Sequence, residues 1–137
     1  MTDIPENLTH LMETFASNKA IIRSSVVSAA AIRFGNLPDI QNFLDTHGAP
    51  DVILGADIGF DLALHTDIAE TLKMLVKNGS TIILCEEIRW ADIFNWYVEE
   101  LSLHFHVETL FDPVLSGYEM KLIRLLRLTD IKKKVSS

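Results

Sequence analysis

One stretch of this chain decides its fold: Asp51-Val52-Ile53-Leu54-Gly55-Ala56-Asp57-Ile58-Gly59-Phe60. An apolar run that follows Pro50 and ends in a polar turn is typical of a strand buried on both faces. Such strands belong to open parallel sheets covered by helices, and ligands bind beyond the carboxyl ends of their strands. Asp57 comes at that end, so we expect the chemistry of the protein to lie near Asp57.

Helix and strand patterns alternate on both sides of this stretch. Hydrophobic periodicity predicts helices over residues 4–17, 38–46, 62–78 and 91–103, and strands over 25–32, 80–85, 104–111 and 118–128. The turn-rich residues 112–117 predict a hairpin between the last two strands. This alternation predicts an α/β fold with a Rossmann-like sheet, mostly parallel, with a C-terminal antiparallel hairpin and helices on both faces. We expect one domain over residues 1–130 and a basic tail over 131–137.

Composition narrows the functional class. The 137 residues are 48% hydrophobic, which favours a packed domain over disorder, and no apolar run approaches the roughly 20 residues of a membrane span. A net charge of -7 disfavours nucleic acid as a partner. The single Cys85 indicates a reducing compartment, so we expect a cytoplasmic or nuclear protein. These features favour protein partners over nucleic acid or membrane.

The N-terminal residues carry a helix-start signal. Asp3 stands three residues before Glu6, the spacing of a capping box, and Pro5 suits a first turn. An apolar stripe then recurs at helical spacing and predicts one buried helix face. This stripe consists of Leu8, Leu11, Met12 and Phe15.

Several of these segments resemble the seven-β-strand methyltransferases that use S-adenosylmethionine, and most closely their protein-lysine branch. Residues 51–60 resemble the fourth strand of that family, with Asp57-Ile58-Gly59-Phe60 in place of its Asp-x-x-Tyr motif. Thr2-Asp3-Ile4-Pro5 resembles the end of the second strand, and Ile32-Arg33-Phe34-Gly35 the segment after the third. Glu86 to Arg89 and Tyr118-Glu119-Met120-Lys121 fit strands five to seven. The resemblance covers nearly the whole chain.

The family's glycine-rich loop after its first strand is missing from the chain. None of the six glycines is spaced as Gly-x-Gly, so the chain resembles a truncated methyltransferase sheet that begins at the end of strand two. In the family's strand order, 3-2-1-4-5-7-6, strand one would lie beside residues 51–56. Without it that strand has an unpaired apolar edge. Three arrangements stay open: residues 25–32 move in beside it, a second copy or another chain pairs with it, or the chain is a piece of a longer protein.

The resemblance implies four site residues. Asp57 would position the methionine end of the cofactor or the substrate amine, and Phe60 would line the substrate pocket, so these two are the candidate catalytic residues. Asp3 would hold the cofactor ribose, and Phe34 would stack on the adenine. Each has a plainer alternative: Asp57 and Asp3 as helix caps, Phe60 and Phe34 as core aromatics.

Other polar residues carry weaker signals. Glu86 and Glu87 follow a predicted strand at the same sheet edge as Asp57, where paired carboxylates can do acid/base work. A solvated loop is the alternative that we favour. His104 and His106 would share a strand face, but no third ligand has suitable spacing, so we expect no metal site.

Three functional hypotheses follow. The resemblance implies a methyltransferase of the protein-lysine type, with S-adenosylmethionine as cofactor. The first alternative is an inactive remnant that serves as a protein-binding module and pairs with copies of itself through the edge of residues 51–56. The second is a fragment without an independent role.

Overall fold

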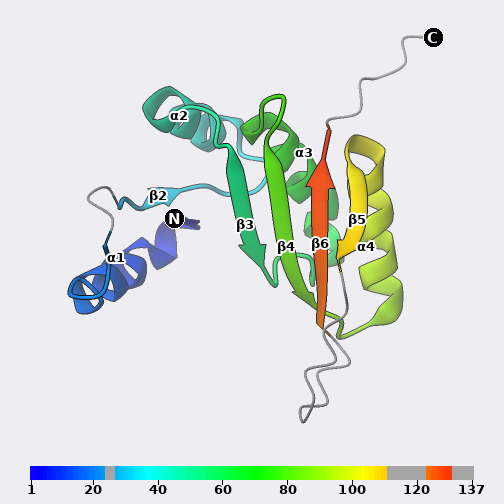
Figure 1. Ribbon diagram of the computed structural model, residues 1–137, viewed down its shortest axis with the longest axis horizontal. Helices are drawn as coiled ribbons and strands as arrows, with labels where there is room; N and C mark the ends of the chain where they lie inside the picture. Colours follow the sequence, from blue (N-terminus) through cyan, green and yellow to red (C-terminus); the bar gives the residue numbers. More distant parts are fainter. Residues whose placement is uncertain (24–26, 111–122, 131–137) are drawn as a thin grey trace. The chain divides into compact units, whose positions relative to one another are not determined.

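The computed structural model describes residues 1–23, 27–110 and 123–130. Its Cα packing divides the chain into two compact units, Met1–Gly48 and Ala49–Ser137 (Figure 1). The single domain expected over residues 1–130 remains a prediction. The expected basic tail, residues 131–137, lies outside the described residues.

The first unit contains a short parallel strand pair. Its elements are β1 (Thr2–Asp3), the 3-10 helix η1 (Pro5–Asn7), α1 (Leu8–Ser17), β2 (Ala30–Ala31) and α2 (Leu37–His47). Asp3 of β1 lies opposite Ala31 of β2. The strand expected over residues 25–32 is therefore much shorter than predicted, because β1 offers only two residues to pair with; residues 24–26 lie outside the described part. The arrangement of this strand beside residues 51–56 stays a prediction.

Helix α1 lies within the predicted segment, but its apolar stripe is less buried than expected. No residue of α1 is fully buried, and Met12 is exposed. The main neighbours of α1 are β1 and η1. These elements are too short to cover a helix face, and the stripe stays half-buried at most.

The second unit is a four-stranded sheet with two helices. Its elements are β3 (Val52–Ala56), the 3-10 helix η2 (Leu62–Leu64), α3 (His65–Leu75), β4 (Thr81–Glu87), α4 (Ala91–His104), β5 (His106–Leu110) and β6 (Ile123–Thr129). The strand order is β3-β4-β6-β5, with β3 parallel to β4 and β6 antiparallel to both of its neighbours. This confirms the α/β class, the hairpin and the strand order that the resemblance implied for this half. None of the described helices has the length and apolarity needed to cross a membrane.

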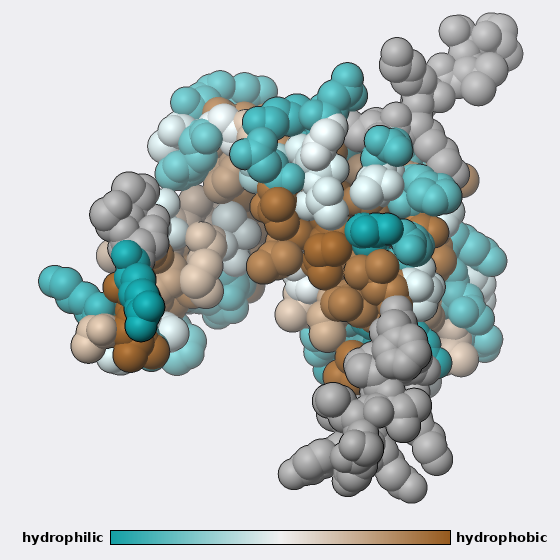
Figure 2. Space-filling model, viewed as in Figure 1, coloured by the Kyte–Doolittle hydropathy of each residue, from teal (hydrophilic) through white to brown (hydrophobic). Residues whose placement is uncertain are grey.

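The two faces of this sheet differ. Helices α3 and α4 lie behind it in Figure 1, and alternate residues such as Ile82 and Leu84 are buried toward them. On the other face Val52 is 58% exposed and Leu54 is 76% exposed. Figure 2 shows hydrophobic residues gathered over this open face. The expected burial of residues 51–56 on both faces is therefore wrong, because both helices of this unit cover the same face and β3 is an edge strand.

Helix α3 ends three residues before the predicted end at Asn78. Ser80 N donates to Lys77 O at 3.0 Å, and Lys77 N donates to Ser80 Oγ at 3.1 Å. Gly79 takes a φ of 85°, a left-handed conformation that glycine adopts freely. These bonds form a tight turn at Gly79 that leads into β4, so the chain leaves the helix earlier than predicted.

Candidate active site

The ends of β3 and β4 bring two polar segments together. The strands are parallel with Ala56 opposite Cys85, and Asp57 N donates to Cys85 O at 2.8 Å. Residues 57–60, which follow β3, and residues 86–90, which end β4 and follow it, therefore lie at the same end of the parallel strands, as predicted for this fold.

Asp57 has a left-handed backbone with a φ of 52°, a conformation that Asp tolerates better than most residues. Its Oδ2 accepts a hydrogen bond from Arg89 NH2 at 2.5 Å. Its Oδ1 is buried without a hydrogen-bond partner among the described residues. The alternative role as a helix cap is wrong, because Asp61 caps η2 by accepting from Ala63 N at 3.0 Å.

Arg89 connects the two segments. Its NH2 lies 2.5 Å from Asp57 Oδ2 and 3.2 Å from Glu87 Oε2, and its guanidinium carbon lies 5.2 Å from the centre of the Phe60 ring. The hydrogen bond with Asp57 raises the pKa of Arg89 further above its ordinary high value. The site therefore holds a permanent cation against an aromatic face, an arrangement that stabilises the cation electrostatically.

The expectation that Glu86 lies in a solvated loop is wrong. It belongs to β4 and is 2% exposed, because alternation turns it toward the helices together with Ile82 and Leu84. Its Oε2 accepts from Gly59 N at 3.1 Å, while its Oε1 has no partner among the described residues. Burial raises the pKa of Glu86 from 4.5 to about 7, against the lowering effect of the Gly59 hydrogen bond. Glu86 was expected in a solvated loop, but it is a buried carboxyl with a pKa near neutrality.

Two further polar side chains, those of His65 and Tyr97, pack against Gly59. His65 Nε2 lies 2.9 Å from Gly59 O, and the His65 and Tyr97 rings are 5.0 Å apart. A Cβ on Gly59 would come within 2.4 Å of the Tyr97 ring, so only glycine fits there. The Tyr97 hydroxyl is buried without a partner among the described residues, and burial raises the pKa of Tyr97 above its ordinary range. Tyr97 lies on the buried side of α4, but nothing local in the sequence indicated that it meets Gly59.

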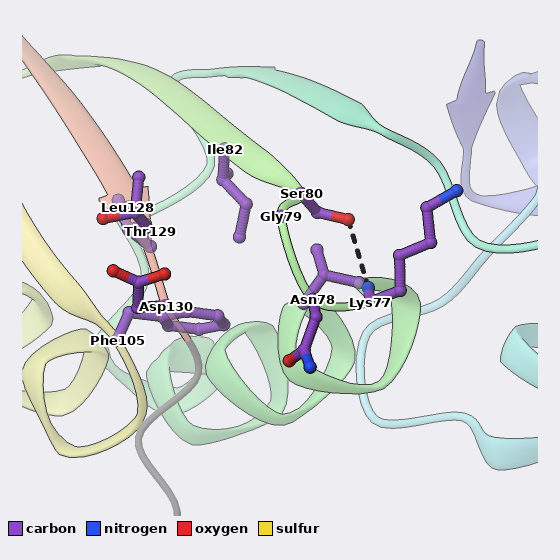
Figure 3. A pocket seen from close by; sticks show the side chains of 10 residues that line it. Lys77, Asn78, Gly79, Ser80, Ile82, Phe105, Leu128, Thr129 and Asp130 are labelled. Atoms are coloured by element: carbon purple, nitrogen blue, oxygen red, sulfur yellow. Dashed lines mark hydrogen bonds between the residues drawn. The ribbon is translucent and has the colours of Figure 1, made fainter.

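The hollow at this edge is small. A cavity of about 10 Å³ is lined by Glu86, Glu87 and Arg89, by the aromatic residues Phe60, Trp90 and Phe94, and by Gly59 and Ile93. That is close to the space of one water molecule. A second cavity of about 70 Å³ lies at the other end of the sheet, where Ser80 follows the α3 turn and Asp130 follows β6 (Figure 3). Among the described residues neither reaches the ~300 Å³ that drug-sized ligands require.

Asp3 and Phe34 lie in the first unit. Asp3 is the last residue of β1 and Phe34 follows β2, and because the two strands are parallel both residues come at the same end of this strand pair. Asp3 Oδ1 accepts from Ile4 N at 2.7 Å and from Asn7 Nδ2 at 3.1 Å, so its carboxylate is oriented by the backbone while it remains exposed. The predicted capping box does not form, because the Glu6 side chain pairs with Arg33, with 3.7 Å between Glu6 Oε1 and Arg33 Nη2. Phe34 is half-buried, which fits both of its predicted roles.

The predicted histidine pair does not share a strand. His104 is the last residue of α4, where its Nε2 lies 3.5 Å from Glu70 Oε1, and only His106 belongs to β5. The helix continues one turn past the polar Glu99-Glu100, since Leu101 is buried in the core. No group of three metal-ligating side chains occurs among the described residues.

Comparison with known proteins gives one family and a set of similar structures. A family model described as lysine methyltransferase matches residues 1–104. No curated protein sequence matches the chain. A precorrin-6y C5,15-methyltransferase from Geobacter metallireducens has 17% identity and a TM-score of 0.60, with 94% of this chain and 66% of that chain covered. A methyltransferase from Pyrococcus furiosus has 14% identity and a TM-score of 0.59, with 93% and 59% covered.

A third similar structure holds a ligand. The N-methyltransferase NodS from Bradyrhizobium japonicum, in complex with S-adenosyl-L-homocysteine, has 15% identity and a TM-score of 0.59, with 93% and 64% covered. The chain spans less than two thirds of the length of each of these three proteins. At such low identity the likeness establishes a common fold, the Rossmann-like fold of S-adenosylmethionine-dependent methyltransferases.

Proposed function

The chain belongs to the lysine methyltransferase family, and from this premise we propose that it contributes to S-adenosylmethionine-dependent methylation of lysine amines in a protein substrate. The observation that carries the proposal is the cluster at the ends of β3 and β4. There Asp57 and Phe60 meet around Arg89, and a buried carboxyl on Glu86 lies beside them.

The acceptor amine sets the chemical requirement. A lysine amine has an ordinary pKa of about 10.4, so it must lose a proton before it can act as a nucleophile. Glu86, whose pKa is raised to about 7 by burial, is a better proton acceptor than an exposed carboxylate. The aromatic side chains Phe60, Trp90 and Phe94 line the same recess and would limit the access of water.

S-adenosylmethionine supplies the activated methyl group when bound, so the protein has to hold and align the reactants. The oriented, exposed Asp3 carboxylate fits the role of acceptor for the ribose hydroxyls. Phe34 would contact the adenine, and Asp57 the methionine end. The chain's own sequence offers no Gly-x-Gly turn for close backbone approach to the cofactor. We propose that another polypeptide segment completes the cofactor site.

Calorimetric titration with S-adenosylhomocysteine tests this proposal. We expect about one site per chain, with affinity lowered by Asp3→Ala and Asp57→Ala. The matched control is Asp45→Ala, since Asp45 is an exposed residue of α2 that makes its hydrogen bond to Gln41 on the same helix. If Asp3→Ala and Asp57→Ala both bind S-adenosylhomocysteine with wild-type affinity, the cofactor lies elsewhere. No detectable heat at high ligand concentration would count against cofactor binding by this chain.

A second candidate function is a non-catalytic module that binds protein, including a second copy of the chain. Two observations favour it: the cavities among the described residues are small, and β3 exposes Val52 and Leu54 at a sheet edge. The hydrogen bonds Thr81 N to Asp51 O and Asp57 N to Cys85 O show that residues 51 and 57 face β4. Strand alternation therefore turns the backbone groups of residues 52, 54 and 56 toward the open edge, where another strand could pair.

A further inference from the structure

The outward side of α4 carries large apolar side chains. Trp96 is 49% exposed and Leu103 is 67% exposed, and they are two helical turns apart, so both lie on one face of the helix. Helical spacing places Asp92 and Glu99 on the same face, and both are exposed. Leu101, which is fully buried, lies on the opposite side. We call Asp92, Trp96, Glu99 and Leu103 the α4 stripe.

The packing of the second unit does not account for this stripe. The main neighbours of α4 are α3, η2 and β5, and α4 meets them with its other side, where Tyr97 and Leu101 are buried. Asp92 and Glu99 have no hydrogen-bond or ion-pair partner among the described residues. Apolar side chains exposed to water cost free energy, and they gather at surfaces that bind partners. The stripe therefore offers apolar and charged groups that the described fold leaves uncovered.

The charge of α4 determines which partner fits. The helix contains three carboxylates, Asp92, Glu99 and Glu100, and no Lys or Arg. His104, its last residue, lies 3.5 Å from Glu70 of α3, so it faces that helix instead of the stripe. Carboxylates beside apolar side chains attract basic residues and repel acidic ones. Charge complementarity therefore selects a segment that combines apolar residues with Lys or Arg.

A second copy of the chain does not meet this requirement through its described helices. Helices α1, α2 and α4 contain no Lys or Arg, and α3 contains only Lys73, which pairs with Glu70 at 2.7 Å. A net charge of -7 on each copy adds general repulsion. The segment that fits the stripe therefore belongs to another protein.

The size of the stripe narrows the partner further. From Asp92 to Leu103 the helix rises by about 16 Å, a length that a partner helix of about 12 residues covers. A surface with two large apolar side chains is much smaller than the ~800 Å² that each partner buries in a stable complex. The stripe therefore suits one short helix that binds reversibly, and it is too small to hold a folded subunit by itself.

We propose that the α4 stripe is a docking surface for a basic amphipathic helix of a partner protein. Apolar side chains of that helix pack on Trp96 and Leu103, and Lys or Arg residues one turn away pair with Asp92 and Glu99. Docking uses none of the candidate site residues and requires no cofactor.

Fluorescence anisotropy of a labelled peptide tests the proposal. The probe is a capped helical peptide of about 14 leucine, alanine and lysine residues, with leucines along one face and lysines beside them. We expect saturable binding to the full chain at micromolar concentration, and weaker binding when the ionic strength is raised. In a parallel nuclear magnetic resonance titration, the indole signal of Trp96, assigned through Trp96→Phe, should shift more than that of Trp90.

Variants of the stripe sharpen the test. Trp96→Ala should weaken binding about tenfold and Leu103→Ala about threefold, because each removes an apolar contact. Glu99→Gln should weaken binding about threefold, because it removes a charge that attracts lysine. The matched controls are Leu37→Ala on α2 and Glu13→Gln on α1, both at exposed positions, and they should leave the affinity unchanged.

Three results would overturn the proposal. They are the absence of saturable binding, affinities that Trp96→Ala and Glu99→Gln leave unchanged, and equal binding of a peptide with the same residues in scrambled order. The last result would show attraction by charge alone. Because peptide binding needs no cofactor, a failed titration with S-adenosylhomocysteine would count against the proposed methyltransferase function and leave the docking surface unaffected.

Discussion

The buried carboxyl of Glu86 makes stability depend on pH in a direction opposite to that of most acidic residues. Its pKa is raised from 4.5 to about 7, so the folded protein binds this proton more tightly than the unfolded chain does. The protonated group therefore contributes stability that is fully present below the unfolded pKa of 4.5. That stability is lost as the pH rises through about 7, where the buried carboxyl becomes charged.

The magnitude follows from the same two values. A tenfold change in proton affinity corresponds to about 1.4 kcal/mol, so a rise from 4.5 to about 7 corresponds to ~3 kcal/mol between acidic and mildly alkaline pH. Nearly all of this loss is reached by about pH 8. Because small domains unfold with only about 5–15 kcal/mol, the loss should be readily measurable.

Glu86→Gln removes the titration while it retains an oxygen for the Gly59 amide. Urea unfolding should give the variant ~2–3 kcal/mol more stability than the wild type at about pH 8, and nearly equal stability at about pH 4 to 5. Glu99→Gln, at an exposed site, should follow the wild-type profile. Parallel pH profiles for Glu86→Gln and the wild type would refute the assignment of a buried, titrating carboxyl.

The remaining predictions concern the same sheet edge and the open strand. Gly59→Ala should lower the free energy of unfolding by ~1–3 kcal/mol in thermal melts, because its Cβ would lie 2.4 Å from the Tyr97 ring. Gly48→Ala should also cost ~1–3 kcal/mol although the space around its Cβ is open, because its φ of 73° and ψ of 177° form a backbone conformation that is essentially restricted to glycine. Tyr97→Phe should be neutral or stabilising in urea unfolding, since the hydroxyl is buried without a partner among the described residues; a loss above ~1.5 kcal/mol would reveal a bond to a group outside them. Asp57→Asn should be more stable than Asp57→Ala by about 1 kcal/mol, because Asn tolerates the left-handed φ of 52° better; equal stabilities would contradict this. If two copies pair through β3, Leu54→Lys should shift sedimentation toward the monomer, and a wild type that is monomeric at micromolar concentration would exclude that pairing.

Patterns that depend only on neighbouring residues predicted the second unit well. The apolar run before Asp57 and the run ending at Cys85 are both strands, and the helical periodicity after each is a helix. Parallel pairing then places their ends at one edge of the sheet. Glu86 and Glu87 therefore lie at the same end of the sheet as Asp57, as expected.

What the sequence could not predict depends on partners distant along the chain. Alternation with Ile82 and Leu84 did point Glu86 inward, but a charged residue at a strand end is ordinarily solvated, and its burial depends on the Gly59 amide 27 residues away. The ion pair between Arg89 and Asp57 was unpredictable for the same reason, since it joins residues 32 positions apart. The length of β2 was set by its two-residue partner β1, which no local pattern reveals.

The two faces of the second-unit sheet differ in how well the described residues cover them, and this difference motivates the proposal of an added partner. Toward α3 and α4 the sheet has a packed core, including Ile82, Leu84 and Leu126. On the open face and edge, β3 presents Val52 and Leu54 without the lysine, proline or bulge that natural edge strands use against unwanted pairing. An apolar edge left free would promote aggregation. Among the described residues β4 is the one strand paired with β3, and the sequence has no Gly-x-Gly turn; we propose that one added segment beside β3 would supply both a partner strand and a glycine turn.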